Sequence, residues 1–332
     1  MTIYNDIDIK KYTTFGVRAT AKRLVEYGSL DDLRRYFASD SLSEGFYVIG
    51  GGSNILFSGH YSGTLLHPVS KGVSVVSEDE SGMTVRAEAG EVWDDFVGRC
   101  VDNGWYGLEN LSFIPGTVGA SAVQNIGAYG AEAGDFIESV EVYDPVSDRC
   151  EVLSGHECAF GYRSSIFKQK RHLIVMSVSY RLSRTFTPRL EYANLRQRVE
   201  ETGVVSALTV RQTVTAVRSE KLPDPAVTGS GGSFFKNPVV EAELADRLSA
   251  LYPQMPRYDA TGGVKIPAGW LIEQAGWKGY RHGDAGVYPK QALVLVNYGS
   301  ATGKEVVDLA ARVAGDVKMK FGIELVPEII IL

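Results

Sequence analysis

Residues 114–130 read IPGTVGASAVQNIGAYG and lie inside a longer stretch, 108–135, that is rich in glycine, alanine, serine and asparagine. Little helical or strand periodicity is present, so we expect a loop without regular secondary structure. An ordered loop of this length is usually functional. Its small residues permit close backbone contact with a flat ligand, and its amide side chains offer hydrogen bonds to polar ring edges.

A second glycine-rich segment, GGGSN at 50–54, follows a short apolar strand predicted at 46–49. Because glycine has no Cβ, the backbone N–H groups of such a segment can approach an anion closely. It is not a Rossmann fingerprint, since Ile55 stands where the third glycine is required, and the chain has no Walker A loop. A tight turn between strands is the alternative interpretation. Taken together, the two segments indicate a large cofactor with a diphosphate and a planar ring, such as FAD.

The remaining pattern predicts an α+β fold, because strands and helices mix without regular βαβ alternation. Pro223 and Pro225 form a sharp break that opens the last part of the chain. The expected strands cover 24–27, 46–49, 73–76, 83–89, 137–143, 173–182, 292–296 and 325–332. The expected helices cover 30–37 (capped by Ser29), 91–103 (ended by Gly104), 191–201, 208–218, 240–251, 268–275 and 302–320.

Composition excludes several classes of protein. The net charge is −6, from 34 basic and 40 acidic residues, with no long basic run, which argues against binding to nucleic acid. No apolar stretch approaches the ~18 residues of a membrane span, and the N-terminal residues do not resemble a secretory signal, so we expect a cytoplasmic protein. The three cysteines lack CxxC spacing and the five histidines lack metal-ligand spacing, which predicts neither disulfides nor a metal site.

Seven motifs, in this order, resemble the MurB family of UDP-N-acetylenolpyruvoylglucosamine reductases, type I branch. They are GGGSN, IPGTVGAS, QNIGAYG, GYRSSIFK (161–168), KLPDP (221–225), GGSFFKNP (231–238) and the terminal PE (327–328). Residues 1–70 and 71–218 also resemble the wider FAD-binding fold of vanillyl-alcohol oxidase, the PCMH type. The resemblance implies two FAD-binding subdomains, 1–70 and 71–218, and a C-terminal α+β substrate-binding domain, 219–332, whose final strand returns to the active site.

The resemblance also implies an activity, that of a UDP-N-acetylmuramate dehydrogenase in bacterial peptidoglycan precursor synthesis. NADPH would reduce a noncovalently bound FAD, and the reduced flavin would reduce the enolpyruvyl group of the UDP-sugar to give UDP-N-acetylmuramate. NADPH and the UDP-sugar are then the partners, and a monomer without a metal is expected. Noncovalent binding is expected because the GGGSN segment offers no histidine for a tether.

Three residues match the catalytic residues of this family. Ser233 matches the proton donor, and the alternative is an ordinary turn serine. Arg163 matches the arginine that polarises the substrate carboxylate, and the alternative is a surface salt bridge. Glu328 lies in a nearly all-apolar segment and matches an active-site acid or an electrostatic partner of Arg163. The alternative for Glu328 is a charge that protects a sheet edge.

Other residues match binding positions of the family. The expected FAD-binding residues are Gly50, Gly51, Gly52, Ser53, Asn54, Ile114, Pro115, Gly116, Gly119, Ala120, Ser121, Gln124, Asn125, Gly127 and Ala128. The expected substrate-binding residues are Tyr192, Lys221, Asn237 and Gln291, with Lys221 on the diphosphate and Tyr192 on a mobile loop that closes over it. A tyrosine that fastens a loop to a helix is the alternative for Tyr192.

Two other functions remain compatible with the residues. An FAD oxidase acting on an alcohol or sugar would keep the fold, would be reoxidised quickly by oxygen and would need no NADPH, but the GSFFKNP segment and Glu328 argue against it. A catalytically silent nucleotide- or sugar-binding protein is disfavoured, because Ser233, Arg163 and Glu328 are all present.

Overall fold

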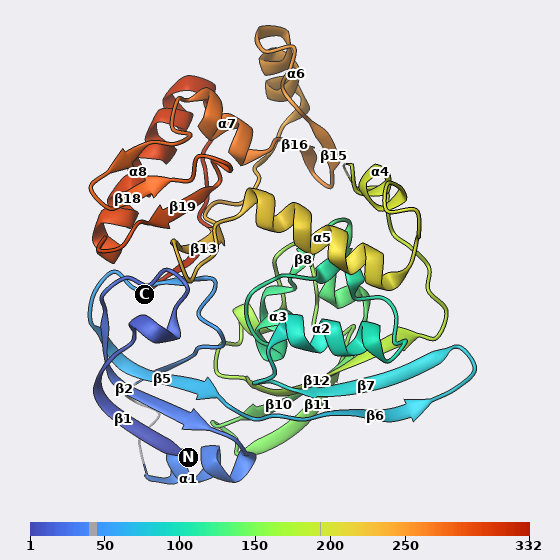
Figure 1. Ribbon diagram of the computed structural model, residues 1–332. Coiled ribbons are helices and arrows are strands. Elements are labelled where there is room, and N and C mark those ends of the chain that lie inside the picture. Colours follow the sequence, from blue (N-terminus) through green and yellow to red (C-terminus); the bar gives the residue numbers. More distant parts are fainter. Residues whose placement is uncertain (40–44, 193) are drawn as a thin grey trace. The chain divides into compact units, whose positions relative to one another are not determined.

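The computed structural model describes residues 1–39, 45–192 and 194–332, and these form an α+β protein, as predicted (Figure 1). In the described part of the chain, no helix is both long and apolar enough to cross a membrane. The three cysteines are free thiols, and Cys100 and Cys158 are buried.

The chain folds into two compact units, each assembled from separate segments. The first unit consists of residues 1–5, 22–51 and 62–218, and the second of residues 6–21, 52–61 and 219–332. One boundary between the units follows residue 218. The second unit additionally includes two early segments, which the sequence did not suggest. The predicted division of residues 1–218 into two FAD-binding subdomains stays a prediction.

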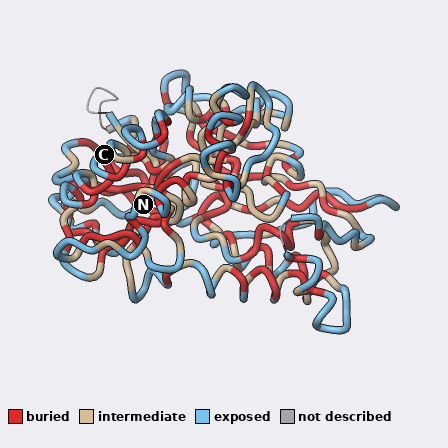
Figure 2. Tube along the Cα trace, turned by 90° about the horizontal axis from the view of Figure 1, so that it is seen from above, coloured by how far each residue is buried: buried red, intermediate tan, exposed pale blue. Residues whose placement is uncertain are grey.

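Two sheets form the framework of the first unit. The larger is antiparallel, with strand order β11 (Arg149–Ser154), β10 (Ile137–Asp144), β12 (Ile174–Ser183), β7 (Gly82–Glu88) and β6 (Val73–Glu78). The smaller has the order β1 (Thr2–Asp8), β2 (Thr20–Tyr27), β5 (Tyr61–Pro68) and β3 (Phe46–Val48), and β3 is parallel to β5. Figure 2 colours the Cα trace by burial, and many of its outward turns are exposed.

Helices α2 (Trp93–Asp102) and α3 (Val118–Gln124) cover one face of the larger sheet (Figure 1). Trp93 and Phe96 pack on the ring of Tyr180, with centroid distances of 5.8 and 5.2 Å. This aromatic cluster forms the centre of a buried core that also contains Val118 of α3. The core therefore fixes α3, and with it the IPGTVGAS motif, against the sheet.

Helix α3 corrects the expectation that 108–135 has no regular structure. Thr117 caps the helix, and its Oγ1 accepts a hydrogen bond from the amide of Ala120 at 3.4 Å. Glycine and alanine give no apolar stripe, but they allow close packing: a Cβ on Gly119 would lie 2.9 Å from that of Ala89. The helix showed no hydrophobic periodicity in the sequence, because small residues replace large apolar ones on its buried face.

The other helices of the first unit are α1 (Leu30–Ser39), α4 (Leu195–Glu200) and α5 (Ala207–Lys221), whose last three residues belong to the second unit. Ser29 caps α1 as predicted, with Oγ accepting from the amide of Asp32 at 3.2 Å. The helix predicted over 191–201 is wrong in its first turn, and residue 193 lies outside the described residues. Before α4, the carbonyl of Arg189 accepts a hydrogen bond from the side chain of Asn110 at 2.8 Å.

The second unit contains two small sheets. One has the order β13 (Gly229–Ser233), β19 (Val294–Asn297), β18 (Ala285–Val287) and β17 (Arg281–His282). The other has the order β14 (Val239–Val240), β16 (Gly263–Lys265) and β15 (Tyr258–Ala260). Helices α6 (Ala242–Leu251), α7 (Ala268–Gln274) and α8 (Gly303–Phe321) accompany them (Figure 1).

The strand predicted over 325–332 is largely wrong. Only Ile330–Ile331 forms a strand, β20, which pairs in parallel with β4 (Ile55–Leu56). Pro327 has no N–H to donate, so it makes only an isolated bridge with Phe235. The amide of Glu328 then donates to the carbonyl of Phe234 at 2.8 Å. The end of the chain is therefore held by two different segments in succession.

Candidate functional site

Gly50 and Gly51 of the GGGSN segment lie against the IPGTVGAS segment within the first unit. A Cβ on Gly50 would lie 2.6 Å from Oγ1 of Thr117, and a Cβ on Gly51 would lie 2.9 Å from Cα of Gly116. Such contacts exclude any side chain at these two positions. The structure thus brings together residues that are widely separated along the chain, as one shared ligand requires.

The backbone amides of the two segments differ in whether they are free to bind an anion. The first amides of α3 are already used: Val118 donates to the carbonyl of Glu91 at 2.9 Å and Gly119 to that of Ala89 at 3.0 Å. Among the residues that the structure describes, the amides of Gly50, Gly51 and Gly52 donate to no protein acceptor. The glycine segment, rather than the helix, therefore offers donors for a diphosphate.

Asn54 links the glycine segment to the end of the chain within the second unit. Its Nδ2 donates to the carbonyl of Glu328 at 3.3 Å, and its own carbonyl accepts from the amide of Ile330 at 3.0 Å. The predicted FAD-binding residue Asn54 thereby positions the backbone of the predicted catalytic residue Glu328.

Replacing Gly52 with alanine is expected to lower the free energy of unfolding by about 2–4 kcal/mol. Gly52 has a φ of 60°, and a Cβ there would collide with the carbonyl oxygen of Tyr12. Urea denaturation of the FAD-free protein measures the effect. Gly59→Ala is the control, since a Cβ on Gly59 meets nothing within 4 Å. Equal stability of the two variants would contradict the close-approach argument.

The QNIGAYG loop is fastened to the GYRSS turn in the first unit. The side chain of Asn125 donates to the carbonyl of Gly161 at 2.9 Å and accepts from the amide of Gly134 at 2.8 Å. Arg163 donates through Nη2 to the carbonyl of Gly127 at 2.6 Å. A Cβ on Gly127 would lie 2.7 Å from Nη1 of Arg163, so the glycine makes room for the guanidinium.

Several residues of these loops have strained backbones. Seven described non-glycine residues have positive φ, and four of them lie in or beside the predicted site: Phe113 (59°), Asn125 (47°), Tyr129 (49°) and Arg163 (52°). A left-handed conformation costs a residue other than glycine roughly 1–2 kcal/mol. Strain of this kind persists where surrounding contacts enforce it, and it is typical of ligand sites.

Tyr192 lies beside the QNIGAYG loop, with its ring 5.7 Å from that of Tyr129 in an edge-to-face arrangement. Its side chain is 56% exposed, whereas Leu190 and Leu195 on either side are buried. Tyr192 is therefore exposed, although a buried leucine lies on each side of it in the sequence.

Tyr129 and Arg218, which the sequence did not suggest as site residues, lie near Arg163 in the first unit. Burial lowers the pKa of the Arg218 guanidinium, while Tyr129 raises it and the positive charge of Arg163 lowers it further. Two arginines and a tyrosine thus share one region of the first unit and would attract an anion. Tyr129 was inside a motif that we quoted, but Arg218 carried no signal, because an arginine on a helix is usually at the surface.

Ser233 and Glu328 come together in the second unit. The backbone amide of Glu328 donates a hydrogen bond to the carbonyl of Phe234, the residue after Ser233. Phe235 and Pro327 form an isolated β-bridge beside it. The pairing of β13 with β19 shifts register between Ser230 and Ser233, where Gly232 has a φ of 74°. Such a bulge redirects the side chain that follows it.

The other predicted substrate-binding residues also lie in the second unit. Asn237 Oδ1 accepts from the amide of Ala268 at 2.9 Å, and Gln291 Oε1 lies 2.9 Å from where a Cβ on Gly269 would be. Both amide side chains therefore lie near the start of α7. Lys221 is exposed at the end of α5.

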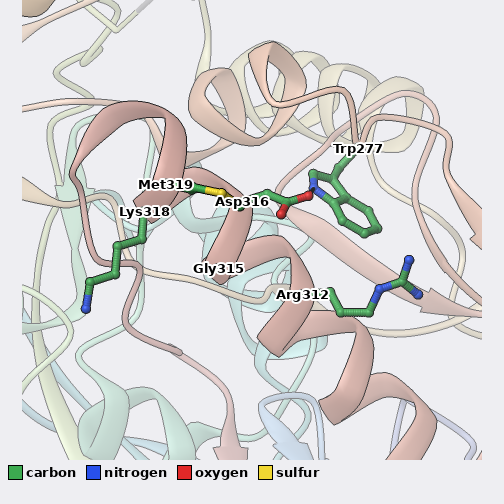
Figure 3. A pocket seen from close by; sticks show the side chains of 6 residues that line it. All are labelled: Trp277, Arg312, Gly315, Asp316, Lys318 and Met319. Carbon is green, nitrogen blue, oxygen red and sulfur yellow. Dashed lines mark hydrogen bonds between the residues drawn. The ribbon is translucent and has the colours of Figure 1, made fainter.

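A surface depression of about 600 Å³ is lined by none of the predicted site residues. Trp277 donates through Nε1 to Asp316 at 3.1 Å, and Arg312 lies 5.1 Å from the tryptophan ring (Figure 3). The polar groups of Trp277, Asp316 and Arg312 therefore already have partners within the protein. In the described residues, no cluster of three or more histidine, cysteine or acidic side chains could hold a metal ion.

Comparison with known proteins shows which family the chain resembles. Residues 23–152 match the family model "FAD binding domain", and residues 224–332 match the model "UDP-N-acetylenolpyruvoylglucosamine reductase, C-terminal domain". The chain is 48% identical to the UDP-N-acetylenolpyruvoylglucosamine reductase of Bacteroides fragilis (strain YCH46), over 96% of each chain. It is also 48% identical to the reductase of Chromobacterium violaceum, over 98% of each chain.

A solved structure is similar over the whole chain. The crystal structure of the MurB reductase from Thermus caldophilus superimposes with a TM-score of 0.70 at 26% identity, covering 100% of this chain and 99% of that one. The matched models, the curated relatives and this structure agree with one another and with the seven motifs. The chain therefore belongs to the MurB family of UDP-N-acetylenolpyruvoylglucosamine reductases.

Proposed function

We propose that the protein reduces the enolpyruvyl group of UDP-N-acetylenolpyruvoylglucosamine to give UDP-N-acetylmuramate, with NADPH as the reductant and FAD as the cofactor. The observation that carries the proposal is the 48% identity to named reductases over 96% of both chains. The presence of Arg163, Ser233 and Glu328 in the matching motifs supports it. We place the reaction in the cytoplasm, in peptidoglycan precursor synthesis, and propose a monomer.

The residues fit a noncovalently bound FAD. The amides of Gly50, Gly51 and Gly52 would hold its diphosphate, and the small residues between Ile114 and Ala128 would allow contact with the flat ring. Asn125 and Ser121 would act indirectly, because their side chains bond to neighbouring protein groups. When bound, FAD supplies a two-electron carrier that takes a hydride from NADPH and passes one to the alkene.

The chain's own side chains supply the remaining chemistry. The Arg163 guanidinium holds the substrate carboxylate and stabilises the negative charge that develops beside it. The Ser233 hydroxyl donates a proton to the carbon adjacent to the one that receives the hydride, so that the double bond gains one hydride and one proton. Glu328 acts as an acid or as an electrostatic partner of Arg163.

The polar side chains of the second unit would hold the UDP part of the substrate. Lys221 would contact the diphosphate as a point charge. Asn237 and Gln291 would offer hydrogen bonds from the start of α7. Tyr192 would close over the diphosphate, as its exposed position between buried leucines permits.

An anaerobic titration tests the proposal. Purified protein is expected to be yellow, to bleach on addition of NADPH and to regain its flavin absorbance on addition of the UDP-sugar. Colourless protein that takes up no added FAD would contradict the proposed function. Rapid reoxidation by oxygen, with an alcohol or sugar in place of NADPH as the reductant, would instead identify an oxidase.

A further inference from the structure

Phe113, the residue directly before the IPGTVGAS motif, has a left-handed backbone with a φ of 59°. Its side chain is 37% exposed, while Ser112 before it is fully buried. The reversal at Phe113 thus directs the chain from the core into the predicted FAD loop. Phenylalanine is a poor residue for this conformation, so something must hold it there.

Both backbone polar groups of Phe113 are bonded to charged side chains from other elements. The amide donates to Oδ1 of Asp94 on α2 at 2.6 Å. The carbonyl accepts from Nε of Arg218 on α5 at 3.1 Å. A charge-assisted hydrogen bond is roughly twice as strong as a neutral one.

Asp94 is itself fixed by Arg211 of α5. Nη1 of Arg211 lies 2.7 Å from Oδ1 of Asp94, and Nη2 lies 3.0 Å from Oδ2. The two side chains are only 20% and 29% exposed, so water screens the pair little. Gly98 lies one turn further along α2, and a Cβ there would lie 3.1 Å from Nη2 of Arg211. The glycine therefore leaves room for the guanidinium to reach Asp94.

We propose that Asp94, with Arg211 behind it, is a positioning residue that holds Phe113 in its strained conformation and thereby preforms the FAD loop. The inference rests on the proposed flavin site. Without Asp94 the free protein would relax at Phe113, and FAD would have to restore the strained conformation on binding.

The test compares FAD dissociation constants of the FAD-free forms, measured by titration with flavin fluorescence. Asp94→Ala is expected to weaken FAD binding about tenfold or more, the equivalent of the cost of one left-handed residue. Asp95→Ala is the matched control. It removes the same charge from the first turn of α2, and Asp95 is exposed. The control is expected to bind FAD like the wild type.

A second substitution separates strain from general damage. Glycine adopts positive φ readily. Asp94→Ala combined with Phe113→Gly is therefore expected to bind FAD within about threefold of the Phe113→Gly single variant. Wild-type affinity in Asp94→Ala, or no recovery in the double variant, would overturn the proposal. Failure of the wild type to bind FAD would instead refute the proposed function.

Discussion

Replacing Ser233 with alanine is expected to slow reduction of the UDP-sugar by about 10²–10⁴-fold, the usual contribution of a general acid. Reduction of the flavin by NADPH is expected to stay near the wild-type rate, because that half-reaction needs no proton from Ser233. Stopped-flow absorbance at the flavin band measures both half-reactions separately, with NADPH in one experiment and the UDP-sugar in the next.

Ser230→Ala is the matched control for this variant. Ser230 lies in the same strand, β13, and loses the same atom on substitution. We expect it to keep both half-reactions, since the contacts of Ser230 with Thr14 are made by its backbone amide and carbonyl. An equal fall of both half-reactions in Ser233→Ala would refute the proton-donor role and indicate a defect in the flavin site.

Replacing Arg163 with alanine is expected to lower kcat/KM for the UDP-sugar by about 10²–10³-fold, as the loss of a charge-stabilising donor does elsewhere. Arg163→Lys is expected to recover little of this, because a lysine keeps the charge but not the planar fork that fits a carboxylate. Steady-state kinetics with varied UDP-sugar measures the effect.

The control variant is Arg171→Ala, which removes an exposed arginine from the same part of the chain. It is expected to behave like the wild type. FAD content must be measured beside activity, because Arg163 also bonds to Gly127 in the predicted FAD loop. Normal kcat/KM in an Arg163→Ala protein with full FAD content would exclude the carboxylate role.

Elements with strong local signals were predicted well from the sequence. Helix α8 begins within one residue of the expected position, because Thr302 and Glu305 form a capping box, and Gly322 ends it with a φ of 72°. Strand β1 was not predicted, because most of its residues are exposed and no buried apolar face marks it. The terminal strand was overestimated because an apolar run does not reveal which backbone partners exist.

The candidate site was predicted from its motifs, and its residue roles stay predictions. Gly51 and Gly116 were named from their motifs, and a Cβ on Gly51 would lie 2.9 Å from Cα of Gly116. Asp94 and Arg218 gave no signal, because their partners are backbone groups of Phe113, whose conformation no local pattern specifies. Residues that position a loop from a distant helix are found only once the fold is known.

The pairing of β20 with β4 has a consequence for the order of synthesis on the ribosome. The core of the second unit includes Phe15 and Leu56, which are translated early, and Ile329, which is translated late. The packing around Phe15 and Leu56 therefore cannot be completed until the last residues of the chain, including Ile329, Ile330 and Ile331, have been made. During that interval these early apolar side chains are open to chaperones or to misassociation with other chains.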